Sequence, residues 1–302
     1  MDARKTYEVI IVGGSYAGLS AAMALGRSLR QVLIIDSGRP CNVQTPHSHN
    51  FLTQDGETPQ AIRAKALMQV LKYPSVSLIE ARAVRGGKTA AGFYIETDAA
   101  EVFSAKKVLF ATGVLDIMPD IQGFAACWGI SVLHCPYCHG YEVRGRQLGV
   151  IGNGDLGYEL SKLISQWSKA LVLFTNGPSA LSKEQTHQLE SKNIRIVEKR
   201  ISSFQHQEGY LQYVVFNDGS QHELTALFAR TSFVQHCSIP EELGCAITEH
   251  GFVEVDDFHK TTIPGIYAAG DNCSVYRAVA AATAAGVKAG AFINKELIED
   301  TF

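Results

Sequence analysis

Residues 7–36, YEVIIVGGSYAGLSAAMALGRSLRQVLIID, decide the fold of the first part of this 302-residue chain. YEVIIV and QVLIID are short, β-branched apolar runs of the kind that forms buried parallel strands. Between them, a glycine turn leads into LSAAMALGRSL, which predicts a helix with small residues on one side. A dinucleotide-binding βαβ unit typically has this order: a strand, a glycine turn, a helix and a second strand that ends in an acidic residue.

The glycine turn matches the dinucleotide-binding pattern G-x-G-x-x-G at two of its three glycines. Gly13 and Gly18 hold the first and third positions, while Ser15 holds the second. The helix that follows has free N–H groups at its N-terminus, which favour a pyrophosphate. Asp36 stands where an acid is expected to hold a ribose hydroxyl. The residues predicted to contact the dinucleotide here are Gly13, Gly14, Ser15, Tyr16, Ala17, Gly18 and Asp36.

The same order of elements recurs at residues 147–174, where QLGVIG, GNGDLG, YELSKLISQWS and ALVLF predict a strand, a turn, a helix and a strand. VLFATG and GIYAAGD are further apolar strands ending in glycine, and an Ala-rich helix over 275–298 follows the second. We therefore predict an α/β fold with two Rossmann-like dinucleotide-binding domains, the second inserted in the first. Residues 1–115 and 246–302 form the discontinuous first domain, and residues 116–245 form the inserted one.

Charge and hydropathy exclude several classes of partner. The chain carries 27 basic and 30 acidic residues, a formal net charge of −3, with no basic cluster. The sequence therefore lacks the clustered positive charge that binding to nucleic acid or to an anionic membrane requires. The N-terminal apolar run is too short for a signal peptide, and Ala278–Ile293 is too short and too alanine-rich to span a bilayer. We expect a cytoplasmic protein, in which a passive structural disulfide is unfavourable.

The string HCPYCHG at residues 134–140 is compatible with three chemistries. Cys-x-x-Cys is a redox pair, two Cys with two His are zinc ligand types, and C-x-x-C-H attaches c-type haem. A zinc site needs four ligands, normally from two separated pairs, and no second Cys-x-x-Cys exists. Haem of this type is normally attached outside a reducing cytoplasm. We therefore predict that Cys135 and Cys138 are a redox pair and that the protein binds no metal.

The stretch TTIPGIYAAGD at residues 261–271 resembles the second FAD motif of two-dinucleotide-domain flavoproteins, and ATG at 111–113 resembles their crossover. With the Cys-x-x-Cys early in the inserted domain, essentially the whole chain resembles the thioredoxin-reductase-like flavoproteins. The resemblance implies FAD as cofactor, a homodimer, Cys138 facing the flavin and Cys135 exchanging with external thiols. It also implies flavin contacts from Asn42, Asn50, Val84, Thr112, Gly113, Gly270, Asp271, Arg277 and Ala278, the last in place of the family's usual Gln.

Two departures from the family concern the nucleotide and the acid–base residue. NADPH-binding members have arginines just after the second strand, but residues 170–194 contain none. Because charge-assisted hydrogen bonds contribute about 1.5–3 kcal/mol each, losing two or three would weaken NADPH binding by at least ~100-fold. Thr175 or Asn176 stands where NAD would need an acid. We expect a degenerate nucleotide site, with NAD(P)H binding through backbone contacts as the alternative.

The other departure is His139, which stands where typical thioredoxin reductases have an Asp. CPYCHGYE resembles the dithiol-oxidase-like members without an arginine cluster. Imidazole, with a pKa of about 6.5, is a base at neutral pH, so we predict His139 as the base for substrate thiols and His134 as a second candidate.

The leading hypothesis is an FAD-dependent thiol–disulfide oxidoreductase that does not use NADPH efficiently, with a small dithiol or disulfide or a thioredoxin-like protein as its partner. The alternatives are an NAD(P)H-dependent reductase of thioredoxin or small disulfides, a disulfide reductase fed by ferredoxin or a second flavin, and a flavoprotein whose thiol state signals to a partner.

Overall fold

The computed structural model describes residues 6–302, and the chain divides into two compact units. The first contains residues up to 43, 51–115 and 233–302, and the second contains 44–50 and 116–232. The chain re-enters the first unit at Phe233, before the boundary expected near residue 246. The reason is that Ile239 and Cys245 are buried in the first unit's core. The chain passes from the first unit to the second within β7 (Val114–Ile117) and returns within β16 (Ser232–Gln235), and these two strands pair with each other.

The first unit is built on a seven-stranded sheet with the order β3-β2-β1-β6-β5-β4, in which β17 also pairs with β6. Val12 on β1 is in register with Ile35 and with Phe110, and Phe110 is in register with Ala268. Because these pairings are parallel, the turns after β1, β2, β6 and β17 meet at one edge of the sheet. The strands are β1 (Thr6–Val12), β2 (Val32–Asp36), β3 (Val76–Glu80), β4 (Ala83–Thr89), β5 (Gly92–Thr97), β6 (Val102–Phe110) and β17 (Ile266–Ala268).

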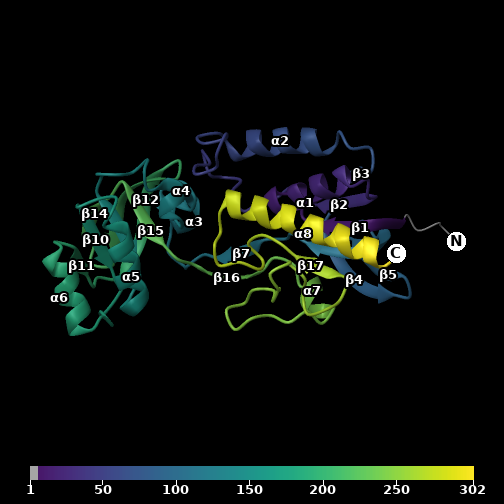
Figure 1. Ribbon diagram of the computed structural model, residues 1–302. Helices are drawn as coiled ribbons and strands as arrows, with labels where there is room; N and C mark the ends of the chain where they lie inside the picture. Colours follow the sequence, from purple (N-terminus) through teal and green to yellow (C-terminus); the bar gives the residue numbers. More distant parts are fainter. Residues whose placement is uncertain (1–5) are drawn as a thin grey trace. The chain divides into compact units, whose positions relative to one another are not determined.

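Helix α8 runs alongside α1 in this unit (Figure 1). A Cβ on Gly286 would lie 2.0 Å from the Ala17 carbonyl oxygen, and one on Gly290 would lie 2.8 Å from that of Ala21. The two helices therefore approach so closely that glycine is required at the contact. The helices of the unit are α1 (Tyr16–Arg27), α2 (Pro59–Val70), α7 (Ile239–Glu242) and α8 (Val279–Glu299), the last beginning later than the expected residue 275.

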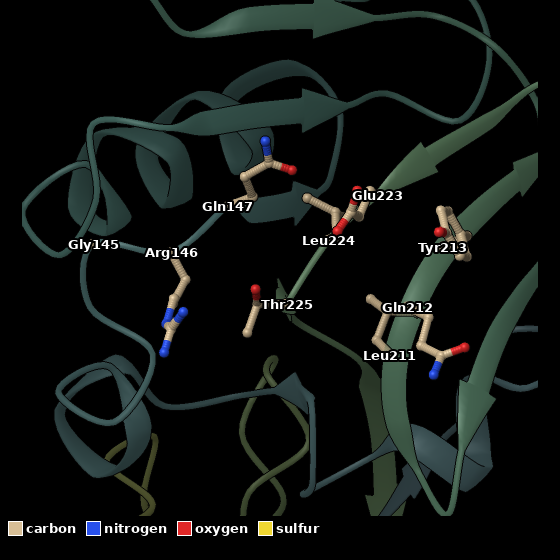
Figure 2. Close-up of a pocket in the computed structure, with 9 residues that line it drawn as sticks. All are labelled: Gly145, Arg146, Gln147, Leu211, Gln212, Tyr213, Glu223, Leu224 and Thr225. Carbon is tan, nitrogen blue, oxygen red and sulfur yellow. The ribbon is translucent and has the colours of Figure 1, made fainter.

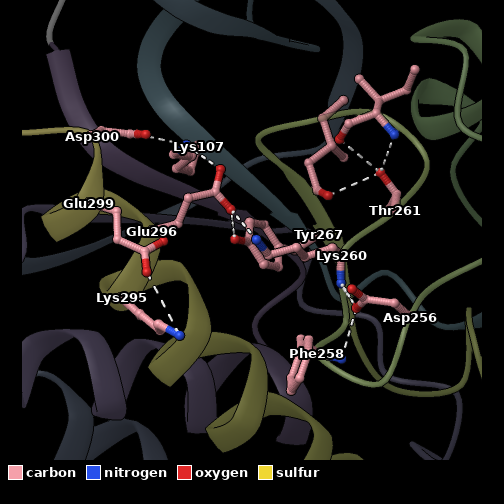
Figure 3. Close-up of polar contacts among 12 residues, drawn as sticks. Lys107, Asp256, Phe258, Lys260, Thr261, Tyr267, Lys295, Glu296, Glu299 and Asp300 are labelled. Atoms are coloured by element: carbon pink, nitrogen blue, oxygen red, sulfur yellow. Dashed lines mark hydrogen bonds and ion pairs between the residues drawn. The ribbon is translucent and has the colours of Figure 1, made fainter.

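The carboxylate of Glu296 anchors α8 to two strands of the sheet (Figure 3). It pairs with Lys107 of β6 and with Lys260, and it accepts a hydrogen bond from the Tyr267 hydroxyl of β17. Burial alone would raise the pKa of Glu296, but the hydrogen bonds from Lys107, Tyr267 and Lys260 lower it to about 2. Lys107 also reaches Asp300 at 2.8 Å. This network holds the helix in place against β6 and β17.

The second unit repeats the parallel arrangement in a five-stranded sheet with the order β11-β10-β9-β15-β8. Ile151 on β9 is in register with Phe174 and with Ala229. Helix α5 begins at Gly154, earlier than the helix expected from Tyr158, because Asn153 caps it. The strands of the sheet are β8 (Val132–Leu133), β9 (Leu148–Ile151), β10 (Leu171–Phe174), β11 (Arg195–Val197) and β15 (Ala226–Ala229).

A small antiparallel sheet completes the second unit. It consists of β12 (Ile201–Gln207), β13 (Tyr210–Phe216) and β14 (Gln221–Glu223). The helices of the unit are α3 (Phe124–Cys127), α4 (Pro136–His139), α5 (Gly154–Ile164) and α6 (Lys183–Ser191). Across residues 6–302, no helix combines the length and the apolar character that crossing a membrane requires.

Candidate active site

The turn between β1 and α1 leaves no room for a side chain at two of its glycines, Gly13 and Gly18. Gly13 has a φ of +104°, and a Cβ there would lie 2.3 Å from the Ala111 carbonyl oxygen. A Cβ on Gly18 would lie 1.8 Å from the Gly13 carbonyl oxygen. The chain therefore folds back on itself so tightly that only glycine fits, which is the backbone shape that a dinucleotide cradle requires.

The N-termini of the long helices differ in how they are capped. Within residues 6–302, the N-cap residues of α1 and α8, Ser15 and Ala278, provide no side-chain cap. Thr58, Asn153 and Ser182 use their own side chains to cap α2, α5 and α6. The first N–H groups of a helix need acceptors, and an anion is a suitable one. The helices that begin without a cap are the two that the sequence assigns to FAD, so these residues fit that cofactor.

Asp36 lies at the end of β2, with its carboxylate held from two sides. Its Oδ1 accepts the Gly14 N–H at 2.9 Å, and its Oδ2 pairs with Arg63 of α2 at 2.6 Å. The carboxylate is therefore fixed beside the glycine turn, where a ribose hydroxyl is expected. Arg63 was not predicted as a site residue, because no spacing in the sequence links it to Asp36.

Phe110 of β6 and Ala268 of β17 are in parallel register, so the loops with Thr112 and Gly113 and with Gly270 and Asp271 follow neighbouring strand ends at the same sheet edge. Asn272 connects them, since its Nδ2 donates to the Phe110 carbonyl oxygen at 2.9 Å. Asn272 is fully buried, and within the described chain its Oδ1 has no hydrogen-bond partner. This unmatched acceptor fits a polar ligand at the edge, and sequence reasoning missed it.

The other predicted flavin contacts are spread more widely. Arg277 pairs with Asp271 at 3.5 Å, and Asn42 donates to the Tyr16 hydroxyl at 3.3 Å. Val84 lies on β4, where the pairing with β5 shifts register. Asn50 has a φ of +59° and belongs to the second unit. The roles assigned to these residues stay predictions.

The predicted redox pair lies at the one-turn helix α4 of the second unit, with Cys135 as its N-cap. Cys135 and Cys138 form a disulfide, and the Cys135 sulfur accepts the Cys138 N–H at 3.2 Å. Pro136 follows Cys135 at the first helical position, where its missing N–H costs nothing. The two sulfurs are thus held by a short, proline-initiated turn.

His139 is half-buried at the end of α4, and three effects act on its pKa. Burial lowers it most, nearby His49 lowers it further, and Glu142 raises it. The net decrease keeps the imidazole neutral at pH 7, which is the state that accepts a proton. The ring of His49 meets that of His139 edge-on at 6.2 Å between centroids, and its Nδ1 lies 3.6 Å from the Glu142 Oε1.

His134, the second predicted base, lies edge-on to Trp128 with the ring centroids 6.3 Å apart. This packing gives the residue a structural role, while its catalytic role stays a prediction. Across residues 6–302, no three or more His, Cys, Asp and Glu side chains are grouped to hold a metal ion.

In the second glycine turn, between β9 and α5, the side chain of Asn153 takes up backbone groups of the turn and of the loop after β10. Asn153 Oδ1 accepts the N–H groups of Gly154 at 2.9 Å and Ala180 at 2.7 Å, and its Nδ2 donates to the Pro178 carbonyl oxygen at 2.9 Å. The loop after β10 is therefore tied down onto the start of α5. A Cβ on Gly177, in that loop, would lie 3.2 Å from the guanidinium of Arg200. Sequence reasoning missed this cation because Arg200 follows the next strand, β11.

An open pocket lies elsewhere in the second unit (Figure 2). It is bordered by the segments 145–147, 211–213 and 223–225, and polar side chains such as Arg146 and Glu223 line it. None of the nine residues that line it is a predicted site residue, so the pocket gives no support to the redox chemistry.

The comparisons with known proteins decide the family. Residues 7–286 match the model of the pyridine nucleotide-disulphide oxidoreductases. The chain belongs to this family. It is similar to the thioredoxin reductase tcpT of Claviceps purpurea, with 30% identity over 99% of this chain and 97% of that protein. The thioredoxin reductase sirT of Leptosphaeria maculans is 31% identical over 95% of this chain and 93% of its own length.

The solved structures agree with the family. A putative thioredoxin reductase, TrxB, from Bacillus anthracis superimposes with a TM-score of 0.94 and 33% identity, covering 98% of this chain and all of that one (100%). The predicted α/β fold with two Rossmann-type domains is therefore confirmed, as is the prediction of a flavin disulfide oxidoreductase similar to thioredoxin reductases. The family binds FAD, in agreement with the predicted cofactor.

Proposed function

We propose that this enzyme exchanges electrons with a small dithiol or disulfide through Cys135 and Cys138 and does not use NADPH efficiently. The observation that carries the proposal is the closed second turn. Asn153 occupies the N-terminus of α5 and ties Pro178 and Ala180 down beside it. A nucleotide pyrophosphate needs these N–H donors and a clear approach to them, and here it would have to displace both the cap and the loop.

The charges around the loop after β10 support the same proposal. Glu198 accepts the Ser179 N–H at 2.8 Å, so a carboxylate faces the loop where a 2′-phosphate would need cations. Arg200 supplies a positive charge beside Gly177. One exposed guanidinium offsets only part of the loss of a cluster, since each charge-assisted hydrogen bond contributes about 1.5–3 kcal/mol.

When bound, FAD supplies a two-electron acceptor or donor for the cysteine pair. Residues 13–18, the Asp36 carboxylate and the N-termini of α1 and α8 would hold it. The exchange proceeds through protein atoms: a substrate thiolate attacks the Cys135 sulfur, and Cys138 leaves as a thiolate. The second substrate thiol, deprotonated by His139, attacks the substrate sulfur of the mixed disulfide and releases Cys135. The substrate gains a disulfide, and the cysteine pair gains two electrons.

Anaerobic stopped-flow reduction tests the proposal directly. We expect dithiothreitol to bleach the visible absorbance of the flavin quickly, and micromolar NADPH or NADH to bleach it slowly or not at all. NADPH should bind at least about 100-fold more weakly than it would with two or three further charge-assisted contacts, so micromolar NADPH should bleach more slowly than dithiothreitol. Rapid bleaching by micromolar NADPH would overturn the proposal.

A second candidate function is an NAD(P)H-dependent reductase of a thioredoxin-like protein. It is favoured by Arg200 beside the nucleotide loop and by relatives named thioredoxin reductases. Rapid NADPH bleaching together with turnover of thioredoxin would establish it in place of the first. In either case we propose a cytoplasmic protein, from its short N-terminal apolar run, and a homodimer, as the resemblance implies; sedimentation of the FAD-loaded enzyme measures that assembly.

A further inference from the structure

Exposed aromatic rings lie beside the cysteine pair in the second unit. Tyr137 stands between the two cysteines in the sequence and is 56% exposed, and Tyr141 is 66% exposed. The Tyr137 ring meets the Trp167 ring edge-on, with the centroids 5.7 Å apart. Tyrosine and tryptophan rings grouped at a surface are typical of a binding site, because they offer rigid apolar area at a low cost in conformational entropy.

Trp167 packs directly against the turn that carries the cysteines. A Cβ on Gly140, which ends α4, would lie 2.7 Å from the Trp167 Nε1. The Trp167 carbonyl oxygen accepts the Gly145 N–H at 2.8 Å, and the Ser168 hydroxyl donates to the Arg146 carbonyl oxygen at 2.6 Å. The segments that precede β9 and β10 are therefore held against each other next to α4.

These two segments also carry three exposed cations, Arg144, Arg146 and Lys169, and none of them forms an ion pair within residues 6–302. The Arg144 guanidinium carbon lies 3.7 Å from the centroid of the Tyr141 ring, and the same guanidinium donates to the Tyr141 carbonyl oxygen. A guanidinium has five N–H donors, so it is fixed here with donors left for a ligand. The Trp167 face, as we call this surface, consists of Tyr137, Tyr141, Arg144, Arg146, Trp167 and Lys169.

The Trp167 face has an excess of positive charge. Glu142 is the acidic residue nearest to it in the sequence, and its carboxylate lies 3.6 Å from the His49 Nδ1. Glu223 borders the same open pocket as Arg146 (Figure 2), but the two form no ion pair in the described chain. Three exposed cations thus outnumber the carboxylates around them, and this balance favours an anionic ligand.

We propose that the Trp167 face binds the substrate of the cysteine pair, and that this substrate is a small thiol compound with an apolar body and a carboxylate. The inference rests on the proposed thiol–disulfide function and specifies its substrate class. The apolar body packs on the rings of Tyr137 and Trp167, while the carboxylate binds the guanidinium of Arg144. A protein partner fits less well, because a stable protein interface takes about 20–30 residues a side and the face is far smaller.

Dihydrolipoate and dihydrolipoamide are matched probes for this inference. They share the dithiol and the hydrocarbon chain, and they differ only in a carboxylate or an amide at its end. The experiment measures the rate of anaerobic flavin bleaching in the FAD-loaded enzyme with each probe below saturation. We expect dihydrolipoate to bleach the flavin about fivefold faster, the upper end of what an exposed charge pair gives. The preference should shrink as salt is added, because exposed charges are screened.

Two variants separate the charge from the apolar contact. Arg144→Gln should abolish the preference, so that both probes bleach the flavin at equal rates. Tyr137→Ala removes a contact that both probes share, so it should slow both about threefold and keep their ratio. Because each result is a ratio of two probes in one variant, a general loss of activity or of folded protein cancels.

A matched control is available at the far edge of the same sheet. Lys183 is an exposed cation at the start of α6, which packs on α5 and β11. Strand β11 is at the opposite edge from β8, which leads into α4. Lys183→Gln therefore removes one positive charge from the unit without touching the Trp167 face, and its ratio of the two rates should match the wild type.

The inference is overturned if the wild type bleaches with the two probes at rates within about 1.5-fold, or if the preference survives in Arg144→Gln. Reduced thioredoxin that bleaches faster than dihydrolipoate at equal concentration, and more slowly in Arg144→Gln, would assign the face to a protein instead. The NADPH result is separate. Rapid bleaching by micromolar NADPH would overturn the proposed function, while the ratio of the two probes would still show what the face binds.

Discussion

The two glycine turns of this protein occupy equivalent places in two parallel sheets and differ in what they leave open. Gly13 follows the registered pair Val12 and Ile35, and Gly152 follows the registered pair Ile151 and Phe174. The left-handed residue is Gly13 in the first turn, with φ +104°, but Gly154 in the second, with φ +54°. The same sheet geometry therefore supports two different backbone paths into the helix.

The difference also extends to the end of the second strand. Asp36 presents a carboxylate beside the first turn, whereas the equivalent Thr175 is buried and donates its hydroxyl to the Gly177 carbonyl oxygen at 2.6 Å. Asn153, at the position of Gly14, completes the contrast by capping α5 itself. A glycine motif thus shows where a chain can turn, while the partners of its N–H groups show whether a nucleotide can bind there.

The largest expected effect comes from removing the glycine that closes the first turn. In Gly18→Ala, the new Cβ would lie 1.8 Å from the Gly13 carbonyl oxygen, so the backbone must move. We expect a loss of at least about 3 kcal/mol in the free energy of unfolding and purification without FAD. The ratio of flavin to protein absorbance after gel filtration measures the FAD loss, and denaturant unfolding measures the stability loss.

Gly157→Ala is the matched change in the second turn. Its Cβ would lie 2.7 Å from the Gly152 carbonyl oxygen, which predicts a cost of about 1–3 kcal/mol. Because that turn holds no flavin in our proposal, the FAD content should stay at the wild-type ratio. Loss of FAD from Gly157→Ala as complete as from Gly18→Ala would end the distinction between the turns.

The fold was predictable because it depends on periodicity and glycine spacing. Short apolar runs flanked by glycine located β1, β2, β9 and β10, and the internal repeat of this order indicated a second domain within the first. The return boundary was harder to place, since Ile239 and Cys245 join the first unit's core through contacts that leave no periodic pattern. The early start of α5 was missed because an Asn–Gly pair also predicts a turn.

The candidate site was less accessible from sequence, because its decisive contacts join residues far apart in the chain. The motif HCPYCHG identified the disulfide-forming pair, and the nature of imidazole identified His139. Nothing in the spacing connects His49 with His139 or Arg63 with Asp36. The absence of arginine from residues 170–194 was visible, but the closure of the turn by Asn153 and the proximity of Arg200 to Gly177 required coordinates.

An intermediate effect on FAD affinity is expected from changing Asp36 at the end of β2, compared with Thr175 after β10. Asp36→Ala removes a carboxylate that accepts the Gly14 N–H and pairs with Arg63. Since a charge-assisted hydrogen bond contributes about 1.5–3 kcal/mol, we expect FAD affinity to fall about 10- to 100-fold. Fluorescence titration of the apoprotein with FAD measures the dissociation constant.

Thr175→Ala is the counterpart in the second unit. It removes the hydrogen bond to the Gly177 carbonyl oxygen and should lower the free energy of unfolding by about 1–3 kcal/mol, with FAD affinity unchanged. Equal affinities for FAD in Asp36→Ala and the wild type would mean that the acid at the first strand end has no part in binding.

The smallest expected effect is a gain of function, and it tests the contrast most directly. Asn153→Gly gives the second turn the glycine that the first has at Gly14, and it removes the cap from Gly154 and the ties to Pro178 and Ala180. We expect the rate of flavin bleaching by NADPH to rise about fivefold over the wild type, as the α5 N-terminus becomes available to the pyrophosphate. Bleaching by dithiothreitol should not change.

Arg200 determines how that gain is interpreted. If its guanidinium beside Gly177 binds the 2′-phosphate once the loop is free, Arg200→Ala in the Asn153→Gly background should abolish the gain with NADPH and leave NADH unaffected, because NADH has no 2′-phosphate. An equal gain with both nucleotides would locate the effect at the pyrophosphate alone. No gain with either would mean that closure of the turn is not what excludes the nucleotide, and that the missing arginines suffice.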